Sequence, residues 1–145
     1  MPIYFCTTTE GQLTADQKAQ IAETITTIYN EETGAPRYLV QVIFNGIAPG
    51  NHFIGGKGAS EDQIWVRCDT RSGKTLTEKN KMMVRIVDDV AKICDIEQNA
   101  VSVLLNETPF SNITEFGRIA PNAGDEAAWF SSLPATLQER LKALS

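Results

Sequence analysis

The sequence lacks any long uninterrupted apolar segment. None approaches the roughly 20 consecutive apolar residues that a membrane-spanning helix needs. The N-terminal segment MPIYFCTTTEGQ contains neither the basic region nor the apolar region of a secretory signal. We therefore predict a cytoplasmic protein that has no membrane partner. With 145 residues, 42% of them hydrophobic, the chain can fill one core but is short for two, so we expect a single domain over residues 1–145.

Positive charge is also scarce. The chain has 13 lysines and arginines against 18 aspartates and glutamates, which gives a formal net charge of -5. Such a surface offers no basic stripe to a phosphate backbone, and we predict that nucleic acid is not a partner. An anionic ligand would have to be bound by a local cationic pocket.

Residues that bind metals or form disulfides are few. The three cysteines, Cys6, Cys68 and Cys94, are widely spaced and lie in apolar periodic segments. This pattern predicts reduced, buried thiols rather than disulfides or a zinc site. The one histidine, His52, has no second histidine or cysteine nearby, and the glycines of residues 55–58 do not have the spacing of a nucleotide-binding loop. We therefore expect no metal and no organic cofactor.

The sequence does contain a weak internal repeat. A shift of 63 positions aligns Leu13-Thr14 with Leu76-Thr77 and Val42 with Leu105. Each half then shows a strand, a helix and a strand, with the strands expected at residues 3–6, 38–44, 64–68 and 101–105. Two βαβ units, about 2–46 and 63–108, predict a four-stranded α/β sheet with both helices on one face. Residues 109–145 form a C-terminal extension with a short helix near 134–144.

Capping signals mark the ends of the two long helices. Thr14 and Gln17 form a capping box for the first, and the second begins at Thr75, with Glu78, or at Thr77. Gly34 ends the first helix by a left-handed cap. The face of the sheet that these helices leave open is too apolar for water, and we expect neighbouring subunits to cover it.

Pro2 is the first candidate for chemistry. A small second residue usually allows the initiator methionine to be removed, which would leave a secondary amine at the tip of a strand. Free α-amino groups titrate at about 7.7 to 8.0, and burial or a nearby cation lowers that pKa further. Such an amine could exchange protons near neutral pH, although proline is also a common second residue that has no role.

Two further candidates lie later in the chain. The loop TRSGKT places Arg71 and Lys74 just before a predicted helix, where two cations and the positive helix end could bind a carboxylate. A solvated basic turn would have the same composition. Glu115 stands between apolar neighbours, and burial would raise its pKa toward that of a general base. An ion pair with Arg118 or Arg71 is the alternative.

Several segments spread along the chain belong together in their order and spacing. They are PIY at 2–4, YLVQVIF at 38–44, FIGG at 53–56, Arg71 with a basic residue three positions later, RIVDDV at 85–90, EFGR at 115–118 and WFSSL at 129–133. Taken in order, these segments resemble the tautomerase superfamily, and within it the cis-3-chloroacrylic acid dehalogenase-like group. The resemblance implies a homotrimer of double βαβ subunits without metal or organic cofactor. It implies Pro2 as the proton-transfer amine, Arg71 as a carboxylate ligand and Glu115 as the group that activates water.

The chain departs from this group at three positions. Tyr29 stands in place of a histidine and cannot supply a positive charge at neutral pH. Lys74 replaces a second arginine, which keeps the charge and loses the planar fork. Leu104 replaces a tyrosine that helps to hold the attacking water, and leucine can neither donate nor accept a hydrogen bond.

These departures favour tautomerisation, which needs no bound water. We expect an amino-terminal-proline tautomerase of small 2-oxo, enol or unsaturated carboxylates, with weak hydratase or dehalogenase activity. One alternative is a cis-3-haloacrylate dehalogenase proper. Another is a non-catalytic trimeric binding protein on the same fold.

Overall fold

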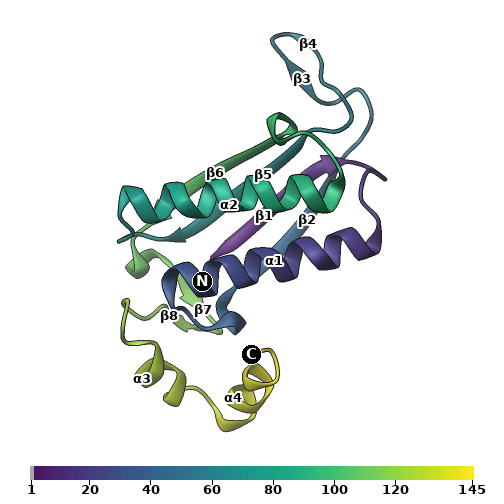
Figure 1. Ribbon diagram of the computed structural model, residues 1–145. Helices are drawn as coiled ribbons and strands as arrows, with labels where there is room; N and C mark the ends of the chain where they lie inside the picture. The colour runs from purple at the N-terminus through teal and green to yellow at the C-terminus, as the bar shows by residue number, and fades with distance from the viewer. Residues whose placement is uncertain (1) are drawn as a thin grey trace.

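The computed structural model describes residues 2–145, and its centre is a four-stranded sheet (Figure 1). The sheet has the order β2-β1-β5-β6. β1 and β2 are parallel, β5 and β6 are parallel, and β1 and β5 are antiparallel at the centre. This arrangement confirms the predicted pair of βαβ units. The strands span Ile3–Thr9 for β1, Gln41–Ile47 for β2, Ile64–Arg71 for β5 and Val101–Thr108 for β6.

Helices α1, Ala15–Thr33, and α2, Leu76–Cys94, lie side by side on one face of this sheet (Figure 1). Both begin with a capping box, at Thr14 with Gln17 and at Thr75 with Glu78, so Thr75 and not Thr77 starts the second helix. The two N-caps are 61 positions apart, which corrects the shift of 63 found in the sequence. Gly34 ends α1 in the left-handed conformation, with φ of 68°, as predicted.

Alternating residues of the central strands form the core beneath the helices. Every second side chain of β1 and β5 is buried, while those between them face the other side of the sheet. Cys6 and Cys68 belong to the buried set, Cys94 is partly buried, and all three are free thiols. Burial raises the pKa of Cys6 and of Cys68 to about 12. The prediction of reduced, buried cysteines is confirmed, and such thiols are poor nucleophiles.

The prediction of a strand over residues 38–44 is wrong at its start. Arg37–Leu39 form a short 3-10 helix, η1, and β2 begins at Gln41. The amide of Leu39 donates to the carbonyl of Pro36 at 3.1 Å, and the Leu39 side chain is buried. Proline fixes φ near the helical value and so initiates this turn, which brings the chain back from α1 to the edge of the sheet.

The smaller elements lie at the two ends of the sheet. A hairpin of β3, Phe53–Ile54, and β4, Lys57–Gly58, projects beyond one end (Figure 1). The C-terminal extension lies at the other end (Figure 1), where the predicted final helix is present as α4. No helix within residues 2–145 is long and apolar enough to cross a membrane. The remaining elements are η2 Gln98–Ala100, η3 Phe110–Asn112, β7 Thr114–Glu115, β8 Arg118–Ile119, α3 Glu126–Ser131 and α4 Ala135–Lys142.

The face of the sheet opposite the helices has apolar side chains in contact with solvent. Ile43, Trp65 and Leu104 on this face are 39%, 42% and 45% exposed. The strand register places Ile43, Phe5, Arg67 and Leu104 in one row across all four strands. A soluble protein that exposes such a row usually covers it with another chain.

Candidate active site

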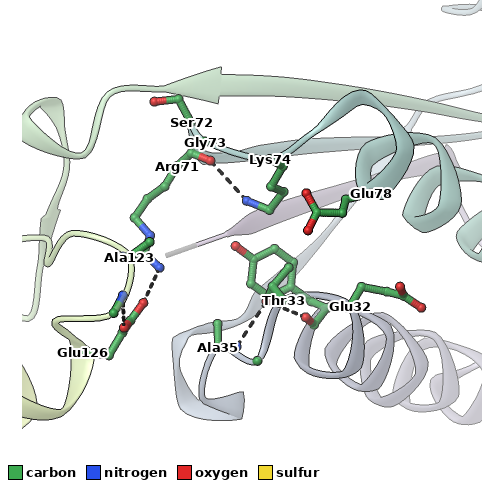
Figure 2. Close-up of a pocket in the computed structure, with 13 residues that line it drawn as sticks. Glu32, Thr33, Ala35, Arg71, Ser72, Gly73, Lys74, Glu78, Ala123 and Glu126 are labelled. Carbon is green, nitrogen blue, oxygen red and sulfur yellow. Dashed lines mark hydrogen bonds and ion pairs between the residues drawn. The ribbon is translucent and has the colours of Figure 1, made fainter.

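A cavity of about 430 Å³ opens where β5 ends and α2 begins (Figure 2). Three segments that are distant in sequence form most of its wall. They are the end of α1 at residues 32–35, the loop at residues 71–74, and part of the C-terminal extension around residues 123–126. Tyr29 of α1 and Glu78 of α2 complete the lining. The sequence predicted a pocket at the 71–74 loop, and the structure adds the other two walls.

Lys74, Thr70 and Tyr29 form one hydrogen-bonded group, of which Lys74 and Tyr29 line the cavity and Thr70 is buried behind it. The ammonium of Lys74 donates to the hydroxyl of Thr70 at 3.1 Å and to the carbonyl of Arg71 at 3.1 Å. The Thr70 hydroxyl is also 3.0 Å from that of Tyr29. The Lys74 nitrogen lies 5.2 Å from the centre of the Tyr29 ring, within the range of a cation-π contact. Tyr29, whose place in the pocket the sequence could not decide, therefore lines the cavity beside Lys74.

Arg71 lines the same cavity but is bound to another carboxylate. One guanidinium nitrogen donates to Glu126 at 2.7 Å, and the other donates to the carbonyl of Pro121 at 2.5 Å. Figure 2 shows Arg71 directed toward the wall that carries Glu126, while Lys74 points toward α1. The arginine predicted to bind a substrate carboxylate is thus paired within the chain.

Pro2 stands just before β1 and is not among the residues that line the cavity. Its carbonyl accepts a hydrogen bond from the amide of Gln41 at 3.0 Å, and the residue is buried. Because Ile3 pairs with Asp69 in the antiparallel register, the next position of that register is Pro2 beside Thr70. Pro2 and Thr70 also share the helix-facing side of the sheet, since side chains alternate along each strand. Pro2 is thus beside the residue that links Lys74 to Tyr29.

Glu115 is buried outside the lining of the cavity. It is 1% exposed and lies on β7, in a hairpin with β8 that turns through Phe116 and Gly117. Both turn residues have positive φ, 49° and 81°, as a two-residue hairpin turn requires. Arg71, one of the two arginines suggested as a partner for Glu115, is paired with Glu126.

Leu104 is a predicted pocket residue that the structure places on the other face of the sheet. It lies within β6, opposite Arg67 of β5, on the face of the sheet that the helices leave open. It is not part of the cavity lining. Leu104 could therefore reach a cavity of this kind only from a second copy of the chain.

At the N-terminus of α2, carboxylates of the chain accept hydrogen bonds from the preceding loop. The amide and hydroxyl of Thr75 both donate to Glu78 at 2.7 Å, and the amide of Lys74 donates to Glu107 at 3.3 Å. These hydrogen bonds from Thr75 lower the pKa of Glu78. Among residues 2–145, no group of three or more histidine, cysteine, aspartate or glutamate side chains gathers to hold a metal ion.

Comparison with known proteins identifies the fold and the family. Residues 1–132 match the family model described as "Putative oxalocrotonate tautomerase enzyme". The structure of N1, a member of the cis-3-chloroacrylic acid dehalogenase family, is 37% identical and superposes with a TM-score of 0.93, covering 97% of this chain and 99% of that one. The chain belongs to the tautomerase superfamily, in its cis-3-chloroacrylic acid dehalogenase-like group.

Other superfamily members share the fold at lower similarity. The structure of Ps01740 is 32% identical with a TM-score of 0.74, over 78% of this chain and 99% of that one. A fused 4-OT described as an asymmetric trimer is 17% identical with a TM-score of 0.75, over 81% of this chain and 95% of that one. At 17% identity, the similarity to the fused 4-OT shows only that the fold is shared. No curated protein matches this chain.

Two residues at or beside the cavity were missed by sequence reasoning. Thr70 could have been found, because the alternation that buries Ile64, Val66 and Cys68 also places it on the helix-facing side of β5. Glu126 had no such signal. It lies in the C-terminal extension, 55 positions after Arg71, and only the folding of that extension over the end of the sheet brings the two together.

Proposed function

We propose that this protein is a tautomerase of small 2-oxo or enol carboxylates, with Pro2 as the proton-transfer group after removal of Met1. The observation that supports this most strongly is the position of Lys74. Its ammonium lies in a cavity beside the start of β1, and its hydrogen-bond partners there are neutral oxygens. A substrate carboxylate can bind such a cation without displacing an internal carboxylate. Arg71 is the second cation of the same wall.

The reaction needs one proton to move across the substrate. A secondary amine at Pro2 would accept the proton of the enol hydroxyl. As the O–H bond breaks, the C–O bond becomes C=O, the electron pair of the C=C bond moves to its far carbon, and that carbon takes a proton from the Pro2 ammonium. The amine is regenerated, so no other reactant is consumed. Burial and the cation at Lys74 would both favour the neutral amine, which is the form that starts this cycle.

Hydration and dehalogenation form the second candidate function, since the 37% identical structure is that of a dehalogenase family member. Glu115 is the candidate that would activate water, and Leu104 offers that water no hydrogen bond. If a tyrosine at position 104 contributed about 2 to 3 kcal/mol, its absence would slow water addition roughly 30- to 150-fold. We therefore assign this activity a minor role. Chloride release as fast as tautomerisation would make dehalogenation the main proposed activity.

The assignment is tested by replacing Pro2. Processed wild-type protein and Pro2→Ala, each with its N-terminus verified by mass, are incubated with an enolpyruvate, 2-hydroxymuconate, an acetylenic acid and cis-3-chloroacrylate, and products are followed by NMR. We expect kcat for tautomerisation to fall at least about 100-fold in Pro2→Ala, the range of general acid-base catalysis. An unchanged rate would contradict the mechanism. Binding without turnover by wild-type protein would instead indicate a non-catalytic binding protein.

The proposal also covers the oligomeric state of the protein and the extent of its domain. We propose that residues 1–145 form a single tautomerase-like domain that works as a homotrimer, without metal or organic cofactor. The exposed row of side chains on the open face of the sheet supports self-association, because it would be buried by a second copy. Neither nucleic acid nor membrane enters this proposal as a partner.

A further inference from the structure

Thr70 is a buried residue whose hydroxyl has two partners on the cavity wall. Its side chain is 1% exposed and does not line the cavity. The hydroxyl accepts from the ammonium of Lys74 at 3.1 Å, since an ammonium can only donate. It also lies 3.0 Å from the Tyr29 hydroxyl, and it can form both bonds at once because a hydroxyl has one proton and two lone pairs. Thr70 therefore acts on a ligand in the cavity only through these two neighbours.

The sheet holds Thr70 firmly in place. It pairs with Glu107 of β6 in the parallel ladder, and the antiparallel register that pairs Ile3 with Asp69 brings Pro2 to its other side. A β-branched side chain has a restricted χ1, so the direction of the hydroxyl is fixed along with the backbone. Thr70 thus provides a rigid acceptor at the end of β5.

Lys74, in contrast, is a long flexible side chain on a loop that contains Gly73 with φ of 119°. Three contacts order its ammonium, which are the Thr70 hydroxyl, the Arg71 carbonyl and the Tyr29 ring. Figure 2 shows the side chain directed from the loop toward α1. An ammonium has three N–H donors, so one can serve a ligand while two remain on these oxygens. The Thr70 hydroxyl is the contact that a substitution can remove without altering the backbone or the ring.

We propose that Thr70 is a positioning residue that holds the Lys74 ammonium in place for the substrate carboxylate. The proposal rests on the proposed function, in which Lys74 and Arg71 bind that carboxylate. A substrate then meets an ammonium whose rotamer freedom has already been lost, and binding does not have to order it. Without the hydroxyl the ammonium is less well placed, and the affinity for carboxylates falls while that for uncharged ligands does not.

The test compares a charged ligand with an uncharged one of the same shape. Butyrate and butyramide differ in charge, and neither has a double bond that could react. NMR titration of processed wild-type protein at constant ionic strength should show tighter binding of butyrate. Thr70→Val keeps the shape of the side chain, and we expect it to weaken butyrate binding about fivefold to tenfold, the range of one hydrogen bond, without weakening butyramide binding. Thr70→Ser retains the hydroxyl and should stay within about twofold of wild type.

Two double variants separate positioning from stability. Tyr29→Phe with Thr70→Val removes the buried hydroxyl that Thr70→Val leaves without its partner, while the ring beside Lys74 remains. This variant should be more stable than Thr70→Val and should keep its low butyrate affinity, and it takes the place of Thr70→Val if that variant does not fold. Lys74→Met and Lys74→Met with Thr70→Val should bind butyrate equally weakly, because the hydroxyl then has no ammonium to hold.

Thr26→Val is the matched control for the loss of a threonine hydroxyl. The Thr26 hydroxyl donates to the carbonyl of Ala22 at 2.8 Å within α1, and Thr26 does not line the cavity. Its replacement should leave butyrate affinity unchanged.

The proposal is overturned if wild-type protein binds butyrate no more tightly than butyramide, or if Thr70→Val keeps the wild-type affinity or weakens both ligands alike. It is also overturned if Tyr29→Phe restores butyrate binding to Thr70→Val, or if Thr70→Val still weakens binding when Lys74 is methionine. These outcomes are distinct from a failure of the proposed function, since the titrations require no turnover. An unchanged rate in Pro2→Ala would contradict the proton-transfer mechanism and would not alter them.

Discussion

At the scale of single residues, Thr70 links two residues of the cavity wall, because its hydroxyl is hydrogen-bonded to both Tyr29 and Lys74. Thr70→Val removes the hydroxyl that lies 3.0 Å from the Tyr29 hydroxyl. Tyr29 is 2% exposed, so its hydroxyl would be left buried without this partner. We expect the free energy of unfolding to fall by about 1 to 3 kcal/mol, the cost of a buried unsatisfied polar group. Urea denaturation followed by circular dichroism measures this change.

Two companion variants test the cause of that loss. Thr70→Ser retains a hydroxyl and should be close to wild type. Tyr29→Phe combined with Thr70→Val removes both partners, so the double variant should be more stable than Thr70→Val alone. If the double variant instead loses the sum of the two single effects, the hydrogen bond between these residues is not the source of the stability.

At the residue scale, the sequence predicts best the groups whose position depends on local structure. Lys74 and Arg71 lie at a short loop between a strand and a helix. Such a loop places its side chains at the end of the sheet, and this placement does not depend on distant parts of the chain. The pairing of Arg71 with Glu126 could not be predicted, because it depends on how an irregular extension folds back over that end. The position of Leu104 on the open face follows from strand register, which the sequence defined only approximately.

At the scale of elements, the ends of the helices were the most predictable features. A capping box and a left-handed glycine act within a few residues, and both capping boxes form as expected. The start of β2 was mispredicted because Tyr38 and Leu39 have side chains typical of strands, while Pro36 initiates a turn that buries Leu39. Strand propensity describes the fit to a half-buried pleated surface, and a local turn overrides it.

Gly34, which ends α1 at the edge of the cavity, allows a test of this capping. Its φ is 68°, and an added Cβ would meet no atom within 4 Å, so substitution is opposed by backbone conformation alone. In Gly34→Ala the left-handed conformation costs roughly 1 to 2 kcal/mol, and the stiffer unfolded chain offsets about 0.4 to 1 kcal/mol of this. We expect a net loss of stability of about 0.5 to 1 kcal/mol in thermal or urea unfolding.

Asparagine and a second glycine provide the comparison for Gly34. Gly34→Asn should lose less than Gly34→Ala, since asparagine tolerates this conformation better. Gly58→Ala, at an equally open position without positive φ, should change stability by no more than about 0.5 kcal/mol. Equal effects of alanine at both glycines would show that the left-handed cap is not what limits substitution.

At the scale of the whole molecule, the open face of the sheet determines how copies of the chain associate. Ile43 and Leu104 stand at opposite edges of the sheet in the same row, 39% and 45% exposed. The alternation of side chains along the strands made this face predictable from the sequence. The number of copies in the assembly could not be predicted from this alternation, because it depends on the curvature of the sheet and on contacts made by the hairpin and the extension.

If other copies cover this face, a buried charge there will prevent assembly. Light scattering after gel filtration should give wild-type protein a mass about three times the 15.9 kDa of one chain, since closed symmetric assemblies bury the same patch in each copy. Ile43→Asp should shift the mass toward one chain, because an unpaired carboxylate in an apolar interface costs several kcal/mol. Val84→Asp, at a 58% exposed position on α2, is the matched control and should leave the mass unchanged. A wild-type mass of one chain at assay concentration would contradict the trimer, and would leave Leu104 without a route to any cavity.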